Sequence, residues 1–340
     1  MARASELGPS VYLHGTIDGP MSADSSAGWS PAATGQAWAV ISALSYTATN
    51  LFLRAASVHI DPWLGSLLRQ APVFIVAWGV VLVARSGEVW PASRRFLGWP
   101  FAAALVAGGA VSFVIGNFFY FDALSAGGLG ISAAAAQAAS MLVGLVAGLA
   151  LLGERPSIYT WIGATVLIAG LALIGAARGS GETWLLSLAF ACAAGTSYAV
   201  ANILTRLVQR ARPTTFPGLA LGAMGGMLPL LAIQLVRNSG NLLAGASAGD
   251  LVIVLVAGCF NALALIGIFQ SLRHVTVAIQ SSLQSATIVF SFVGAVILFA
   301  EPASPMMIGG VLAVSAGIVV AQLRRRAKVA AIPQPLTGES

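Results

Sequence analysis

A long internal repeat constrains the fold of this chain more than any other feature of its sequence. The segment from Gln137 to Gly170 recurs 147 residues later, from Gln284 to Gly317. In each copy an apolar stretch of membrane length ends just before a Glu, and a second apolar stretch with two spaced Gly follows. The matched positions are Gln137 and Gln284, Ser140 and Thr287, Glu154 and Glu301, Gly163 and Gly310, and Gly170 and Gly317. Because solenoid repeats have periods of about 20 to 50 residues, we interpret this repeat as two homologous halves.

The composition places the chain in a lipid bilayer. Only 8% of its residues are charged and 58% are hydrophobic, whereas a soluble domain carries about 25% charged residues. Ten stretches approach the length of about 20 apolar residues that spans the hydrocarbon core. We therefore predict an all-α integral membrane protein with ten transmembrane helices, at 36–53, 65–84, 98–119, 129–152, 158–177, 184–206, 216–236, 251–271, 276–299 and 306–323.

The distribution of Lys and Arg predicts the orientation of these helices. With the N-terminus inside, thirteen Lys and Arg lie in cytoplasmic segments and only Arg54, Arg178 and Arg237 lie on the opposite side. By the positive-inside rule, both termini of this multi-pass protein are cytoplasmic, in the cytoplasmic (inner) membrane. The same asymmetry accounts for the net charge of +6, so no nucleic-acid partner is expected. Because five helices are an odd number, the second half enters from the other side and the two repeats are inverted.

A second match supports the inverted repeat and sets the predicted domain boundaries. The ten residues from Ser45 to Arg54 correspond at a spacing of 152 to those from Ser197 to Arg206, with identical Ser, Tyr, Asn and Arg. We predict a disordered cytoplasmic tail at 1–34, a first five-helix repeat at 35–178, a second at 183–323 and a basic cytoplasmic tail at 324–340.

These features resemble a known transporter family. The chain has two five-helix halves, and the fourth helix of each ends in a Glu turn: Leu-Gly-Glu-Arg-Pro from Leu152 and Phe-Ala-Glu-Pro from Phe299. Arg69 lies near the start of the second helix. This pattern resembles the EamA-like branch of the drug/metabolite transporter (DMT) superfamily. The resemblance covers about residues 36–323. It implies transport of small organic metabolites, since members export amino acids and related compounds, take up others, or carry sugar nucleotides. The Phe-Ala-Glu turn, and the lack of an Arg in the seventh helix to match Arg69, indicate that the halves have diverged.

Polar residues within the predicted spans define a candidate substrate site. Such side chains normally face a bundle interior or a wet cavity, because lipid leaves their hydrogen bonds unsatisfied. We expect a central cavity, with the helices at 158–177 and 306–323 at its periphery. Tyr hydroxyls, aromatic walls and amides suit a zwitterionic or polar aromatic solute; the alternative is hydrogen bonding between helices, at about 0.6 to 2 kcal/mol each. The candidates are Tyr46, Asn50, Asn117, Tyr120, Gln137, Ser140, Tyr198, Asn202, Asn261, Gln284 and Thr287.

Charged residues at or near the ends of the predicted spans are expected to be structural rather than to bind the substrate. We predict that Glu154 and Glu301 are structural carboxylates at the membrane interface, where they end a helix, contact neighbouring backbone or an Arg, and fix the hairpin into the next helix. Arg69 could pair with an anionic group of the substrate, but its place about two turns from a helix start favours snorkelling to the interface. No Asp, Glu or His is predicted deep in a span, which favours a facilitator or exchanger over a proton-coupled carrier.

The leading functional prediction is a secondary transporter that exports an amino acid or related compound by alternating access. The alternatives are uptake, a nucleotide or vitamin-type solute, and a non-transporting membrane scaffold. An enzyme is not expected, because no His and acidic residues cluster at one depth. Neither a cofactor nor a metal is predicted, since Cys192 and Cys259 lie within apolar runs without metal-ligand spacing. The expected partners are a small-molecule solute and the lipid bilayer, with a homodimer left open.

Overall fold

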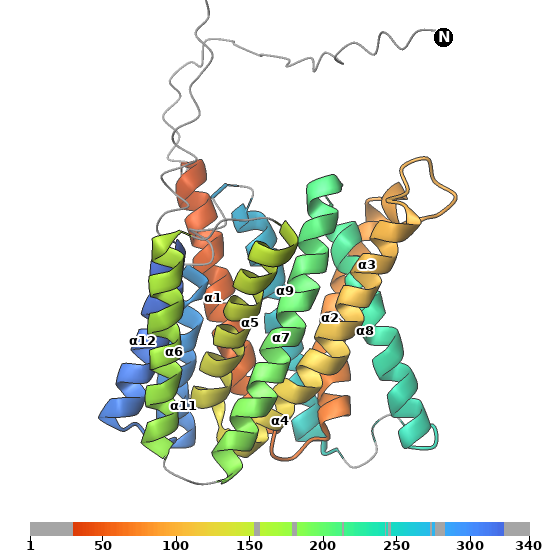
Figure 1. The fold of residues 1–340 in the computed structure, drawn as a ribbon. Coiled ribbons are helices and arrows are strands. Elements are labelled where there is room, and N and C mark those ends of the chain that lie inside the picture. Colours follow the sequence, from red (N-terminus) through yellow and green to blue (C-terminus); the bar gives the residue numbers. More distant parts are fainter. Residues whose placement is uncertain are drawn as a thin grey trace, which may run out of the picture.

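The computed structural model describes residues 30–152, 157–178, 182–212, 214–241, 243, 246–272, 274–275 and 283–322. Within these ranges the chain is all-helical, with no strand, and long helices run side by side through the bundle (Figure 1). The predicted all-helical class is confirmed. In chain order the elements are α1 (Pro31–Ala56), α2 (Pro62–Val83), η1 (Gly87–Val89), α3 (Trp99–Gly109), η2 (Ala110–Gly116), α4 (Asn117–Gly127), α5 (Leu129–Leu152), α6 (Ile158–Arg178), α7 (Glu182–Ala211), α8 (Phe216–Arg237), α9 (Ala248–Leu272), α11 (Ala286–Phe299) and α12 (Pro305–Gln322).

The described helices have the length and composition of membrane spans. Seven of them are long and apolar enough to cross a bilayer, namely α2, the continuous run from α3 to α4, and α5 to α9. Two further apolar helices, α11 and α12, are shorter. The chain is therefore a multi-pass membrane protein, as the sequence predicted.

Side-chain caps determine where the first two helices begin. Ser30 accepts a hydrogen bond from the backbone N–H of Ala33 at 3.2 Å, and a proline follows it at the first helical position. Asp61 accepts from the N–H groups of Trp63 and Leu64, at 3.0 and 3.2 Å. Both arrangements satisfy N–H groups that a helix start leaves without partners. As a result α1 begins at Pro31, within the segment predicted as a disordered tail at 1–34; residues 1–29 and 323–340 lie outside the described residues.

The helix from Trp99 to Gly127 contains a feature that the sequence did not predict. Its middle turn, η2, is a π-helix. Glycines at this turn allow neighbouring helices to approach closely: a Cβ on Gly109 would collide with the backbone carbonyl of Gly222 in α8, and a Cβ on Gly116 would lie 2.7 Å from the Tyr198 ring of α7. π-Helical turns within α-helices are frequent at functional sites, and η2 contributes residues to the cavity described below.

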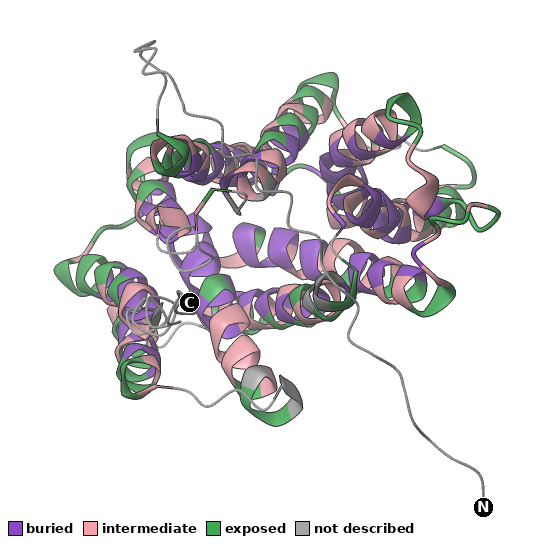
Figure 2. Cartoon of the chain, turned by 90° about the horizontal axis from the view of Figure 1, so that it is seen from above, coloured by how far each residue is buried: buried purple, intermediate pink, exposed green. Residues whose placement is uncertain are grey.

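The helices α6 and α12 pack against each other at the edge of the bundle (Figure 1). A Cβ on Gly317 would lie 2.6 Å from the carbonyl oxygen of Gly163, and one on Gly170 would lie 2.8 Å from that of Gly310. The spaced glycines of the repeat thus let the backbones of α6 and α12 lie in close contact. The view from above shows buried residues facing the interior and exposed ones facing outward (Figure 2). No residue of α6 or α12 lines the central cavity, so their expected peripheral position is confirmed as well.

Candidate functional site

One cavity of about 550 Å³ lies between the helices and is walled by α1, α2, α3 to α5, α7 to α9 and α11. All eleven residues proposed from the sequence as substrate-site candidates line it. The lining also includes residues outside this set of candidates, among them Arg69, for which snorkelling was favoured over substrate contact. These are Arg69, Ser112, Thr205, Thr214, Thr215 and the apolar Leu105, Phe113, Leu219, Leu265, Ile268 and Ile288, with small Ala and Gly residues between them.

On the α1 and α11 side of the cavity the polar residues are bonded to one another. The Asn50 side-chain amide donates to Ser291 Oγ at 3.2 Å and accepts from the Tyr120 hydroxyl at 3.2 Å. Ser42 Oγ donates to Gln284 Oε1 at 3.1 Å, and Thr287 Oγ1 donates to a backbone carbonyl of α1 at 3.1 Å. These contacts tie α11 to α1.

The equivalent amides on the α5 and α7 side have no such partners. Asn202 and Gln137 line the cavity and are exposed, and neither makes a hydrogen bond within the part of the chain that the structure describes. The repeat explains the difference. At spacings of 147 and 152, the positions that match Ser291 and Ser42 are Gly144 and Ala194, which have no hydroxyl to offer. Asn202 and Gln137 are therefore free to bind a solute.

Arg69 lies inside the cavity wall, so the prediction that it snorkels to the interface is wrong. The residue is only 7% exposed. Its Nη1 donates to Asn117 Oδ1 at 3.1 Å and its Nη2 to Asn261 Oδ1 at 3.4 Å, from helices α4 and α9. The guanidinium carbon is also 5.8 Å from the centre of the Tyr120 ring. Because amide oxygens and an aromatic face meet the cation within the bundle, it has no need to reach the interface.

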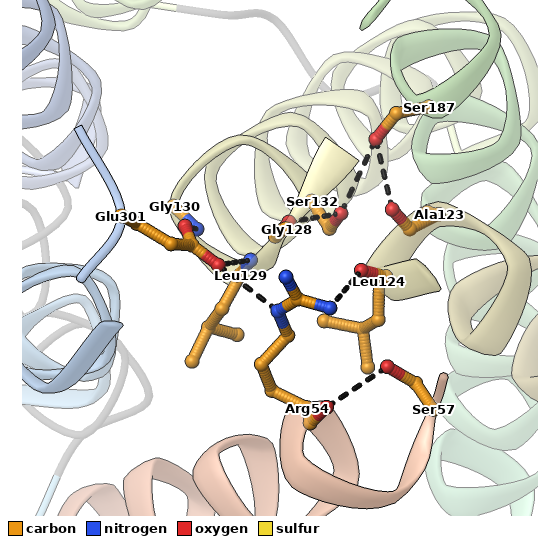
Figure 3. A network of polar contacts seen from close by, with 10 residues as sticks. All are labelled: Arg54, Ser57, Ala123, Leu124, Gly128, Leu129, Gly130, Ser132, Ser187 and Glu301. Atoms are coloured by element: carbon orange, nitrogen blue, oxygen red, sulfur yellow. Dashed lines mark hydrogen bonds and ion pairs between the residues drawn. The ribbon is translucent and has the colours of Figure 1, made fainter. Parts of the chain in front are cut away.

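Figure 3 shows a second polar cluster, the Arg54–Glu301 network, which joins α1, α4, α5 and the segment after α11. Glu301 accepts from Arg54 Nε at 3.0 Å and from the backbone N–H groups of Leu129 and Gly130 at 2.8 and 3.1 Å. Arg54 Nη1 also donates to the carbonyl of Leu124 at 3.0 Å. The α5 N-terminus thus presents its free N–H groups and its positive dipole end to a carboxylate.

Glu301 lies near an end of the bundle, and its side chain contacts an Arg and backbone N–H groups, the two kinds of contact predicted for it. The residue is 7% exposed, and these partners belong to α1 and α5 rather than to the next helix. Two left-handed residues shape this region, Gly128 before α5 (φ 83°) and Ala300 after α11 (φ 50°). The second is unusual for alanine and directs the chain so that Glu301 turns back into the bundle. Glu154, its counterpart in the first half, lies outside the described residues.

The cavity and the Arg54–Glu301 network occupy different depths of the bundle. The network lies at the end where α1 finishes, and none of its side chains lines the cavity. In the opposite direction the lining reaches Thr214 and Thr215, in the connection from α7 to α8, at the end where α1 begins (Figure 1). The cavity thus extends toward one end of the bundle while polar bonds hold helices together at the other. Among the described residues, no three His, Cys, Asp or Glu gather where they could hold a metal ion.

The structure is a multi-pass helical bundle around a polar cavity. Residues 33–176 match the model of the EamA-like transporter family. The match confirms the resemblance to the EamA-like branch of the DMT superfamily. The matched family is one of membrane transporters.

The comparison with solved structures supports the fold over most of the chain. A crystal structure of a protein matches with a TM-score of 0.59 and 19% sequence identity, over 86% of this chain and 98% of that chain. At this identity the likeness concerns the fold alone. No curated protein matches the chain.

Proposed function

We propose that the chain is a secondary transporter that moves a small organic metabolite across the cytoplasmic membrane by alternating access, as a facilitator or exchanger. The observation that carries the proposal is the cavity itself, which draws polar residues from both halves of the chain and extends toward only one end of the bundle. Amino acids or related compounds, and the direction of export, come from the family resemblance. The single Arg69 in the described lining disfavours a nucleotide or other multiply charged solute.

Helix packing supports the proposal of ten spans in two inverted repeats, 35–178 and 183–323. An inverted twofold relation pairs α1 with α7, α2 with α8, α6 with α12 and the run from α3 to α4 with α9. The contacts between helices are consistent with this relation. The contact of α1 with α9 corresponds to the contact of α7 with the run from α3 to α4. The helices α2 and α8 contact each other, as do α6 and α12, so each of these pairs corresponds to itself.

The positive-inside orientation assigns the two ends of the cavity. If both termini are cytoplasmic, the lining at Thr214 and Thr215 faces the cytoplasm and the Arg54–Glu301 network closes the outer end. In this proposal the structure is an inward-facing state, ready to receive a solute from the cytoplasm. Uptake instead of export would use the same two states in the reverse order.

A flux assay tests the proposal. Purified protein in liposomes is loaded with unlabelled amino acids or related metabolites, and entry of the labelled compound by counterflow is measured. We expect flux above that of empty liposomes, and a loss of at least tenfold in the Asn202→Ala variant, because this amide is free to hold the solute. The matched control is Asn241→Ala, which removes the same group from an exposed loop. A scaffold would give no flux in any sample, and equal flux in the two variants would refute the cavity assignment.

A further inference from the structure

The cavity holds a buried positive charge that no described carboxylate neutralises. Among the described residues that line the cavity, Arg69 is the one Lys or Arg, and none is Asp or Glu. The ion pairs found in the described part of the chain involve Arg54 and Arg237 instead. The partners of Arg69 are neutral, namely two amide oxygens and an aromatic ring.

The hydrogen bonding around Arg69 leaves donors in excess. The Oδ1 atom of Asn117 accepts twice, from Arg69 and from the Tyr198 hydroxyl at 3.0 Å. The Nδ2 group of Asn117 and the Nε of Arg69 are buried and find no acceptor within the described residues. Buried donors and charges without partners are costly. What this part of the cavity lacks is therefore an acceptor with negative charge.

The charge of the cavity discriminates between classes of solute. A zwitterionic amino acid would place its carboxylate near Arg69. Its ammonium group would then be desolvated, with no carboxylate in the described lining to pair with it. The amide oxygens of Asn117 and Asn261 are already occupied by the guanidinium. A dianion such as a phosphate monoester would keep one charge unpaired. A solute with one negative charge and an otherwise neutral body is the class that leaves no charge unmatched.

We propose that the cavity binds small organic monocarboxylates, with Arg69 as the group that pairs with the carboxylate. This inference rests on the proposed transport function, whose substrate class it names: relatives of amino acids that lack a free ammonium group. Asn202 and Gln137 remain available for neutral polar groups of the solute. Apolar residues and Tyr rings of the lining suit its hydrocarbon or aromatic part.

Four compounds of one shape and different charge test the proposal. They are 3-phenylpropanoate (an anion), phenylalanine (a zwitterion), 2-phenylethylamine (a cation) and 3-phenylpropanamide (neutral). Each is titrated into the full-length protein in detergent, and apparent dissociation constants are taken from the rise in melting temperature. We expect 3-phenylpropanoate to bind about 10- to 100-fold more tightly than the other three, because hydrogen bonds to a charged group are the strong ones. Equal or tighter binding of phenylalanine or the amine, or no binding of any compound, would overturn the proposal.

Variants of Arg69 separate substrate binding from a purely structural role. Arg69→Gln should weaken binding of 3-phenylpropanoate to the level of 3-phenylpropanamide, while Arg237→Gln, which removes an exposed cation outside the cavity, should leave it unchanged. Arg69→Lys keeps the positive charge but loses the planar, forked set of guanidinium donors. This variant should bind 3-phenylpropanoate about tenfold more weakly than wild type and still prefer it over 3-phenylpropanamide. If Arg69→Gln does not fold, Arg69→Lys provides the test. A preference for the anion that survives in Arg69→Gln would show that Arg69 only ties helices together.

The binding and flux measurements can fail separately. Binding in detergent does not require transport, so Arg69-dependent binding of the anion without flux in liposomes would refute the transporter and leave the anion site. Flux of a solute with no preference for the monocarboxylate, in wild type and in Arg69→Gln alike, would refute the anion site and leave the transporter.

Discussion

In the proposed orientation, replacing Glu301 by Gln should open the outer end of the bundle. The carboxylate accepts hydrogen bonds from Arg54 and from the backbone N–H groups of Leu129 and Gly130. It therefore joins three separate segments, α1, the start of α5 and the chain after α11. An amide has one oxygen where the carboxylate has two, and it has no charge. In Glu301→Gln at least one of the three donors is left facing an N–H group instead of an acceptor.

The size of the effect follows from burial. The side chains of Glu301 and Arg54 are 5% and 19% exposed, and removing one partner of a buried ion pair costs about 3 to 5 kcal/mol. We take about 3 kcal/mol, because Arg54 retains some solvent and the carbonyl of Leu124. If this energy is lost only when the outer end is closed, the ratio of closed to open forms falls by about 100-fold.

A cysteine reporter measures the change. Ser140→Cys places a thiol in the cavity wall with little change in size, in a background without Cys192 and Cys259. A membrane-impermeant maleimide is added to the outer face of oriented vesicles, and the labelling rate is followed. We expect faster labelling in the Glu301→Gln background, up to the 100-fold limit set by the change in population.

The control variant removes an ion pair at the same end of the bundle. Arg237 and Asp61 are 3.4 Å apart, with side chains 47% and 39% exposed. Such exposed pairs contribute about 0 to 1 kcal/mol. Arg237→Gln should therefore leave the labelling rate of the reporter nearly unchanged. Equal labelling in Glu301→Gln and Arg237→Gln would refute the idea that the network holds this end closed.

Two further predictions concern packing and energetics. Gly317→Ala should lower the free energy of unfolding by about 1 to 3 kcal/mol, because the added methyl would lie 2.6 Å from a backbone carbonyl of α6. Gly309→Ala is the control: nothing lies within 4 Å of the added Cβ, so the substitution should raise the stability slightly through helix propensity. Melting temperatures of the two purified variants test this difference. Flux of an uncharged analogue in liposomes should not respond to an imposed pH gradient, because the described cavity lining holds no Asp, Glu or His; a steep acceleration would contradict the facilitator or exchanger mechanism.

The cavity residues could be predicted from the sequence because two local signals coincide there. Amides and tyrosines such as Asn202 and Tyr198 are polar within long apolar stretches, and they recur at a fixed spacing in both halves. In a bilayer, polarity inside a span is enough to indicate the inner face of a helix. The peripheral position of α6 and α12 followed from the same reasoning, since those helices carry few polar residues. These predictions needed no knowledge of which helices touch.

Other features could not be predicted because they depend on contacts between distant segments. Arg69 was assigned to the interface from its depth alone, and only the positions of Asn117 and Asn261 show why it stays inside. The sequence predicted that Glu301 contacts backbone or an Arg but not which Arg, because Arg54 lies 247 residues away in the chain. The π-helical turn η2 likewise depends on how closely α7 and α8 approach. In each case the decisive partner lies on another helix.

The divergence of the two halves predicts which state of the proposed cycle is favoured. Asn50 bonds to Ser291, and Ser42 to Gln284, on the side that the Arg54–Glu301 network also joins. In the outward-facing state of the proposed cycle, the first-half and second-half residues would exchange roles. The positions that match Ser291 and Ser42 are Gly144 and Ala194, so these two hydrogen bonds have no equivalents there. At about 0.6 to 2 kcal/mol each, their loss favours the inward-facing state by roughly tenfold or more. The Ser140→Cys reporter measures this bias. Ser291→Gly should raise the labelling rate from the outer face by less than Glu301→Gln does, because it removes one neutral hydrogen bond rather than a buried charge. No rise at all would show that the Asn50–Ser291 bond does not affect the ratio of the two states.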